Sequence, residues 1–168
     1  QLQGLWNKKK VESSINTRSK SGKEDPLCLL LLNCRRENSR MSDLETVAKF
    51  LAESVIASTA KTSERNLRQL ETQDGFGLTL LHVIASTNLP LSTRLAGALF
   101  FKNFIKRKWV DENGNHLLPA NNVELIKKEI VPLMISLPNN LQVQIGEAIS
   151  SIADSDFPDR WPTLLSDL

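Results

Sequence analysis

The side chains that could do chemistry in this sequence are few. The two histidines stand in different settings, His82 in an apolar run and His116 in a polar stretch. Neither belongs to a His/Cys/Asp cluster with metal-ligand spacing, so no metal site is predicted. His82 stands among leucines, where we expect a packing residue. The two cysteines, Cys28 and Cys34, are too few for a disulfide framework and favour a reducing compartment.

The polar stretch VDENGNHLLPANN, residues 110–122, superficially resembles a calcium loop. Asp111, Asn113 and Asn115 alternate as calcium ligands do. His116, however, stands where the turn glycine belongs, and Asn122 stands where the bidentate glutamate belongs, so we reject a calcium site. The sequence also lacks a nucleophile elbow, a phosphate-binding glycine loop and a CxxC motif. It therefore predicts a protein that is not an enzyme and that uses no cofactor.

The most distinctive polar residues lie on one predicted helix, which runs from about residue 92 to Trp109. At about 100° per residue, one strip of this helix carries three cations and an amide, away from the broad face of Phe101 and Phe104. The four residues are Lys102, Asn103, Lys106 and Arg107. Such a strip suits an acidic protein surface, and an ordinary solvated face is the alternative.

The elements that position this strip are all helical. Residues 41–168 show seven apolar stripes at helical spacing and no strand pattern. Ser63 is expected to cap the second helix, and Pro132 is expected to kink or break the fifth. Alternate helices begin roughly 32 to 46 residues apart, which is the size of a two-helix solenoid repeat. A compact helical bundle is the alternative.

Charge divides the chain near Met41. Residues 1–40 carry nine Lys/Arg against four Asp/Glu, whereas residues 41–168 carry twelve against fifteen. The first part has no sustained helical or strand period, so we predict a disordered leader. Non-native sequence before a natural start at Met41 explains it more simply than a genuine leader does. The acidic remainder gives no electrostatic support for nucleic-acid binding. The longest apolar run, Leu27–Leu32, is too short for membrane insertion.

Three segments resemble the N-terminal module of the importin-β (karyopherin-β) superfamily: SERNLRQL from Ser63, GFGLTLL from Gly75, and RLAGALFFKNFIKRKW over Arg94–Trp109. A fourth, FPDRWPTLL from Phe157, is similar to the segment that opens a later repeat in these receptors. The resemblance covers residues 41–168 and leaves out residues 1–40. Within the superfamily, the sequence looks most like the yeast-type exporters that return importin-α to the cytoplasm.

The resemblance implies an all-α fold, a right-handed HEAT-repeat solenoid of antiparallel helix pairs. About three repeats and the start of a fourth would be present, truncated at the C-terminus. It implies binding of GTP-bound Ran through the second helices, here Ser63–Thr72, Ser92–Trp109 and Leu141–Ala153. Lys102, Asn103, Lys106 and Arg107 are then Ran-binding candidates.

The further partners that the resemblance implies are importin-α as cargo and nuclear pore proteins. The receptor would shuttle between nucleus and cytoplasm, and the nucleotide would belong to Ran. Two alternatives remain open from the sequence: another importin-β-type receptor, and a generic helical-repeat scaffold for protein interaction.

Overall fold

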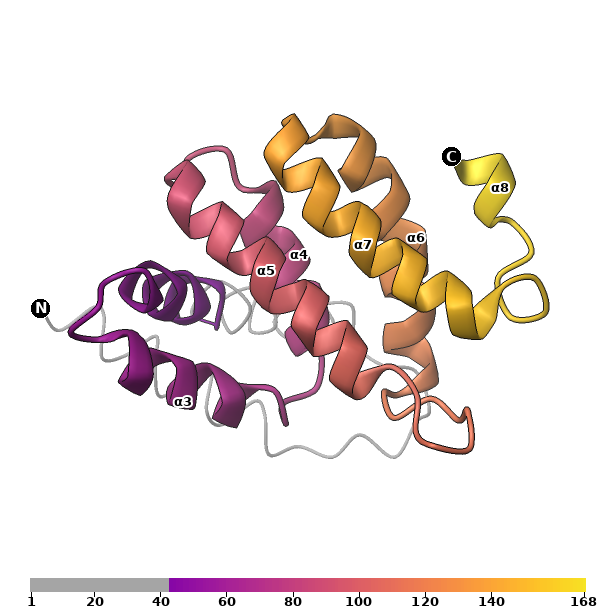
Figure 1. Cartoon of the computed structure of the whole chain (residues 1–168), viewed down its shortest axis with the longest axis horizontal. Helices are drawn as coiled ribbons and strands as arrows, with labels where there is room; N and C mark the ends of the chain where they lie inside the picture. Colours follow the sequence, from indigo (N-terminus) through magenta and orange to yellow (C-terminus); the bar gives the residue numbers. More distant parts are fainter. Residues whose placement is uncertain (1–42) are drawn as a thin grey trace, which may run out of the picture. The chain divides into compact units, whose positions relative to one another are not determined.

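The computed structural model describes residues 43–168, all within one compact unit, Asn38–Leu168. The predicted leader and its boundary at Met41 lie outside these described residues. A first helix covers residues 43–54. Six labelled helices follow it (Figure 1): α3 (Ala60–Leu70), α4 (Phe76–Ala85), α5 (Leu91–Lys108), α6 (Ala120–Ser136), α7 (Asn139–Asp156) and α8 (Leu164–Asp167). No helix in this part of the chain is long and apolar enough to cross a membrane.

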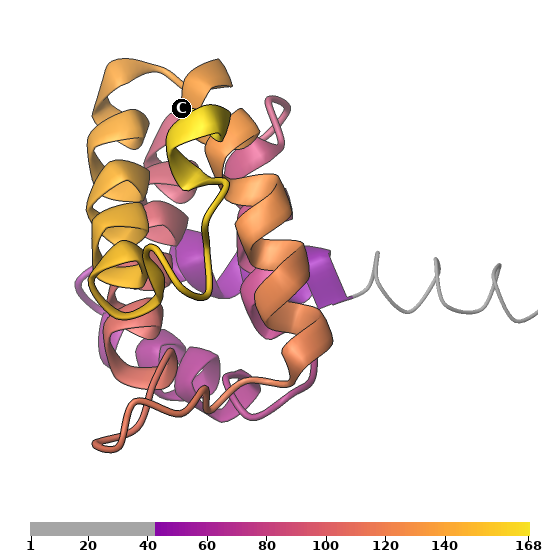
Figure 2. The ribbon, with the colours of Figure 1, turned by 90° about the vertical axis from the view of Figure 1, so that its right-hand side faces the viewer.

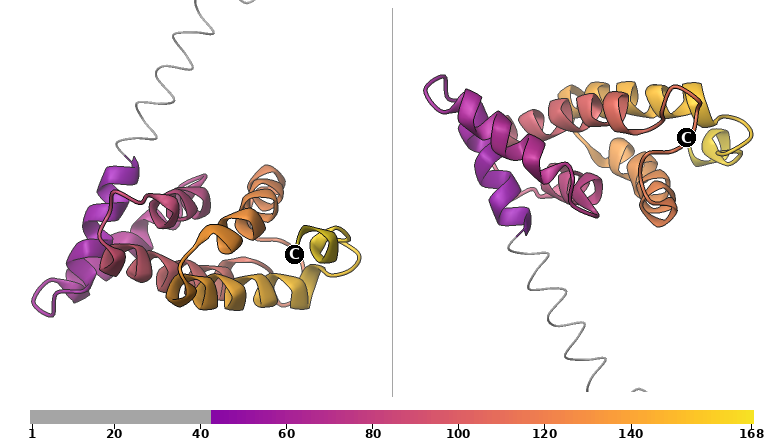
Figure 3. Two further views of the ribbon diagram at one scale, coloured as in Figure 1. Left: turned by 90° about the horizontal axis from the view of Figure 1, so that it is seen from above. Right: turned by 90° about the horizontal axis from the view of Figure 1, so that it is seen from below.

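The helices form stacked pairs in two layers. α4 packs on α5 and α6 packs on α7, while α4 also contacts α6 and α5 also contacts α7. The views in Figure 1 and Figure 3 place α5 and α7 in one layer and α4 and α6 in the other, with α3 running obliquely beside α5 at the N-terminal end. We call α3, α5 and α7 together the second-helix layer. This arrangement confirms the predicted all-α solenoid of HEAT-type helix pairs.

The core runs between the two layers. α4 is apolar on nearly every side, and it packs against both α5 and α6. Phe101 and Phe104 of α5 are fully buried, which confirms the predicted apolar face of that helix. Phe76 meets Phe104 edge to face, with ring centroids 5.6 Å apart, a favoured geometry for aromatic pairs.

Two glycines allow close approach of neighbouring helices. A Cβ on Gly77 would lie 3.0 Å from Ile126 Cδ1 and 3.1 Å from Phe104 Cε1. A Cβ on Gly97 would lie 3.4 Å from Leu51 Cδ1. Gly77 therefore brings α4 close to both α5 and α6, and Gly97 brings α5 close to the first helix.

Two details differ from the sequence-based expectations. Ser63 does not cap a helix, because α3 begins three residues earlier, at Ala60. Its buried hydroxyl donates instead to Glu53 Oε2, 3.1 Å away, and so joins α3 to the first helix. Of the kink or break expected at Pro132, the break does not occur, because α6 continues to Ser136. Pro132 is exposed, and the contacts of α6 with α4 and α7 hold the helix on other sides.

The C-terminal segment lies at the end of the α6–α7 pair. α8 follows a loop over residues 157–163 and begins at Leu164. In Figure 2 this segment lies in front of α6 and α7. Trp161 and Leu164 are buried and anchor it to the core.

Candidate functional site

The four predicted partner-binding residues lie on α5, in the middle of the second-helix layer. α5 lies between α3 and α7 in the view of Figure 1. Because Phe101 and Phe104 point into the core, the rest of the helix surface faces either a neighbouring helix or solvent. The structure divides the four residues between these two environments.

Lys102 faces the neighbouring helix. Its ammonium group donates to Gln144 Oε1 at 2.7 Å and to Glu147 Oε2 at 3.0 Å, both on α7. Its side chain is only 15% exposed. Lys102 is thus engaged within the protein rather than free on the strip.

Arg107 is also paired, on the opposite flank. Its guanidinium group forms an ion pair with Glu71, just after α3, and lies 6.0 Å from the ring centroid of Phe100. The Glu71 side chain is almost entirely buried, while Arg107 keeps about a third of its side chain exposed. Arg107 therefore connects α5 to the end of α3 and still presents part of its charge to solvent.

Asn103 and Lys106 are the open positions of the strip. Both are exposed, and neither has a hydrogen bond or ion pair to any residue that the structure describes. Exposed donors that are free of intramolecular partners need no rearrangement before they bind another protein. These two residues are consequently the most accessible polar groups among the four candidates.

The flanking helices add further exposed groups to the second-helix layer. On α3, Lys61 and Arg65 are exposed and lie opposite the buried Leu67. On α7, Val143 and Asp154 are exposed. This layer therefore offers cations on α3 and α5, and a mixed apolar and acidic surface on α7.

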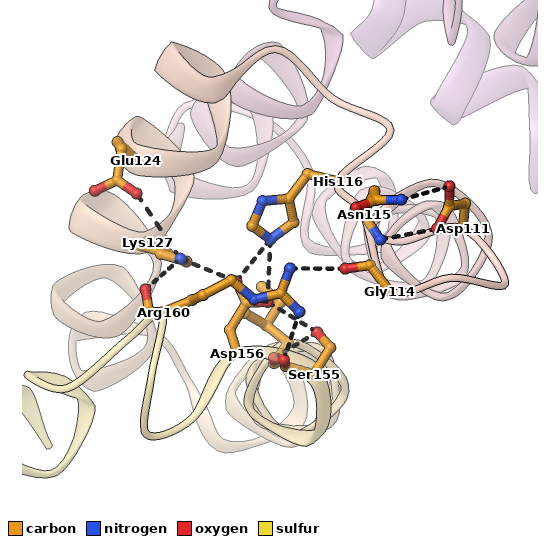
Figure 4. A network of polar contacts seen from close by, with 10 residues as sticks. Asp111, Gly114, Asn115, His116, Glu124, Lys127, Ser155, Asp156 and Arg160 are labelled. Carbon is orange, nitrogen blue, oxygen red and sulfur yellow. Dashed lines mark hydrogen bonds and ion pairs between the residues drawn. The ribbon is translucent and has the colours of Figure 1, made fainter.

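A second polar cluster lies at the far end of the fold and surrounds Asp156, the last residue of α7. Lys127 Nζ lies 2.9 Å from Asp156 Oδ2, His116 Nε2 lies at the same distance, and Arg160 Nε lies 3.4 Å from Oδ1 (Figure 4). Arg160 also donates to the carbonyls of Gly114 and Ser155, each at 2.7 Å. We call these four charged or titratable residues the Asp156 cluster.

The Asp156 cluster is structural. Burial alone would raise the pKa of Asp156, but hydrogen bonds from Lys127 and His116 and their positive charge outweigh it, so the pKa lies below its usual value. The cluster joins the 110–119 loop, α6, α7 and the segment that leads to α8. The Asp156 carboxylate is thus already paired with donors within the protein.

In the 110–122 stretch, which superficially resembles a calcium loop, the Asp111 carboxylate binds the backbone of its own loop. Asp111 accepts hydrogen bonds from the backbone of Asn115 at 2.8 Å and of Asn113 at 2.9 Å. These bonds, the one from Asn115 foremost, lower the pKa of Asp111. Gly114 adopts a φ of 80°, which closes the turn.

The histidines do not form a reactive site. His116 belongs to the Asp156 cluster and packs edge to face on Trp109, with ring centroids 5.4 Å apart. The expectation that His82 packs in the core was wrong: it is exposed on α4, with Nε2 3.5 Å from Glu129 Oε2. Within residues 43–168, no group of three or more His, Cys, Asp or Glu side chains could hold a metal ion.

Sequence reasoning missed the Asp156 cluster, although one signal was present. Lys127 stands on the apolar stripe that also carries Val123, Ile126 and Ile130. A lysine on a buried stripe requires a buried partner, and this alone indicates an ion pair. The identity of Asp156 as that partner, in another helix, depends on the tertiary fold.

The stacked helix pairs define a helical-repeat protein of the HEAT type. Residues 63–136 match the family described as Importin-beta N-terminal domain. The chain belongs to the importin-β superfamily, whose members are transport receptors.

Named relatives agree with this assignment. The chain is 43% identical over 127 residues to the importin-alpha re-exporter of Schizosaccharomyces pombe, covering 74% of this chain and 13% of that protein. It is 33% identical over 132 residues to exportin-2 of Drosophila melanogaster, covering 76% and 14%. Human exportin-2 is 32% identical over 131 residues, covering 76% and 13%. The chain thus spans about an eighth of the length of the relatives it matches.

Proposed function

We propose that this chain is the Ran-binding N-terminal segment of a nuclear export receptor that carries importin-α to the cytoplasm. The observation that carries the proposal is the match of residues 63–136 to the importin-β N-terminal domain, combined with an open strip on α5 within that match. The likeness to an importin-alpha re-exporter and to exportin-2 supports the export direction and the cargo. Residues 41–168 serve as the first HEAT repeats of this receptor.

The proposed contact uses the second-helix layer. Asn103 and Lys106 of α5 are exposed without intramolecular partners, and Lys61 and Arg65 of α3 add exposed cations. Arg107 contributes the part of its guanidinium group that Glu71 leaves open. Charges of this kind mainly accelerate association with an acidic partner and select it against others.

The nucleotide in this proposal belongs to Ran. GTP-bound Ran promotes cargo binding in the nucleus, and hydrolysis releases the cargo in the cytoplasm, so the receptor itself performs no chemistry. Shuttling requires passage through the pore, and nuclear pore proteins are therefore proposed as further partners. The receptor is accordingly placed in both nucleus and cytoplasm.

The experiment compares Ran loaded with GTP and with GDP on the immobilised 168-residue chain. We expect tighter binding of the GTP form. Lys106→Glu should lower the affinity about tenfold or more, mainly through a slower association rate. Lys128→Glu is the matched control, because Lys128 is an exposed lysine of α6 in the opposite layer. Equal binding of both nucleotide forms, or equal losses in both variants, would overturn the proposal.

A further inference from the structure

We infer that Lys102 is a positioning residue, which fixes α7 beside α5 and so determines the surface that the proposed partner meets. This inference rests on the proposed function and changes the role of one predicted contact residue. Its basis is a bridge between helices of consecutive pairs: Lys102 donates to both Gln144 and Glu147, which are 42 and 45 residues away in sequence.

The number of its partners favours a connecting role. An ammonium group has three N–H donors, and two of those of Lys102 are directed at α7 at 2.7 and 3.0 Å. With 15% of the side chain exposed, little of Lys102 is left for another protein. Lys106, one turn further along α5, has the opposite character, since it is exposed and unpaired among the described residues.

The bridge also adds a directional restraint on the axial position of α7 along α5. The buried side of α7 is lined by aliphatic residues such as Ile145 and Ile149. Apolar burial is non-directional, so it leaves sliding of one helix along the other weakly restrained. Two directed hydrogen bonds from one ammonium group to acceptors one turn apart fix the axial register of α5 and α7.

This register decides which side chains stand next to one another in the second-helix layer. Leu99 lies one turn toward the N-terminus from Lys102 and is 40% exposed. Val143 lies one turn toward the N-terminus from Glu147 and is 58% exposed. On the other side of Lys102 stand Asn103 and Lys106. A partner that contacts both helices therefore meets the apolar Leu99 and Val143 beside the polar Asn103 and Lys106, in an arrangement that the Lys102 bridge stabilises.

A charge swap separates a connecting residue from a contact residue. Lys102→Glu places a carboxylate against Glu147, and we expect about a tenfold loss of affinity for GTP-loaded Ran. Adding Glu147→Lys restores an ion pair of opposite orientation, and we expect affinity within about threefold of the wild type. The matched control is Lys106→Glu with the same Glu147→Lys change, in which no recovery is expected.

The salt dependence of association provides a second readout. Lys106→Glu should slow association and weaken its dependence on ionic strength, because it removes a steering charge. The swapped Lys102/Glu147 pair should keep both the rate and its salt dependence near the wild-type values. A swapped pair that stays as weak as Lys102→Glu alone would make Lys102 a contact residue and overturn the inference.

Thermal unfolding tests the bridge independently of any partner. Lys102→Glu should lower the unfolding midpoint by roughly 2–4 °C, the scale of a partly exposed ion pair in a chain of this size, and the swap should recover most of it. If the chain fails to bind GTP-loaded Ran but shows this recovery, the proposed function is wrong and the bridge stands. If unfolding shows no coupling between residues 102 and 147, the bridge is wrong.

Discussion

Replacing Asp156 with asparagine removes a fully buried negative charge from between Lys127, His116 and Arg160. Lys127 Nζ lies 2.9 Å from the Asp156 carboxylate, and the Lys127 side chain is only 6% exposed. Breaking a buried ion pair by removing one partner typically costs about 3–5 kcal/mol. Because Lys127 retains a 2.7 Å hydrogen bond to the carbonyl of Arg160, we expect the lower end of that range, about 3 kcal/mol of unfolding free energy.

The assay is denaturant unfolding of the 168-residue chain, followed by circular dichroism. Asp154→Asn is the matched control, since it makes the same change on the same helix at an exposed position without a partner among the described residues. Surface substitutions of that kind usually stay within about 0.5 kcal/mol. If Asp156→Asn and Asp154→Asn unfold at the same denaturant concentration, the stabilising role of the Asp156 cluster is refuted.

The same variant makes a prediction about pH. The pKa of Asp156 is lowered in the folded protein from its ordinary value of 3.8. A depressed folded-state pKa contributes stability that is present above the unfolded-state pKa and is lost as pH falls through the folded-state pKa. The difference in unfolding free energy between wild type and Asp156→Asn should therefore be larger at pH 5 than at pH 3, because it shrinks as pH falls below about 4. A difference that does not change down to pH 3 would contradict the assigned ionisation.

Four further changes test the packing of the chain. Phe101→Ala and Phe104→Ala should each destabilise by about 3–5 kcal/mol in denaturant unfolding, and a variant that unfolds like the parent would contradict its burial. Gly77→Val should lower the thermal midpoint, because even a Cβ there lies 3.0 Å from Ile126; an unchanged midpoint would mean that α4 and α6 separate freely. Deleting residues 1–40 should change the unfolding free energy by less than about 1–2 kcal/mol, and a larger loss would show that this segment packs on the repeats.

Most of the architecture was predictable because it depends on local patterns. Apolar residues at helical spacing gave the helices, and the interval between alternate helices gave the paired repeat. The buried side of α5 followed from the helical positions of Phe101 and Phe104. These features need only the periodicity of one segment at a time.

The errors come from effects that a local pattern does not contain. Ser63 has the residue type of a cap, yet its hydroxyl serves a contact with Glu53 on another helix. Pro132 disfavours a helix interior, yet α6 continues past it to Ser136 without a break. His82 stands among leucines in sequence and still reaches solvent, because consecutive residues of a helix point to different sides.

The sequence predicted the four residues of the candidate site, but not which of them are paired within the protein. Helical geometry placed Lys102, Asn103, Lys106 and Arg107 on one strip. The acceptors of Lys102 lie 42 and 45 residues away on α7, and the partner of Arg107, Glu71, lies 36 residues away. Only the stacking of the repeats reveals that two of the four residues are already engaged.

Lysine acylation footprinting shows which layer of the repeats GTP-loaded Ran covers. Lys61 and Lys106 are exposed in the second-helix layer, and Lys128 is exposed in the other. On addition of GTP-loaded Ran, we expect slower acylation of Lys61 and Lys106, an unchanged rate at Lys128, and no change with GDP-loaded Ran. Protection of Lys128 with Lys106 left fully reactive would contradict the proposed contact.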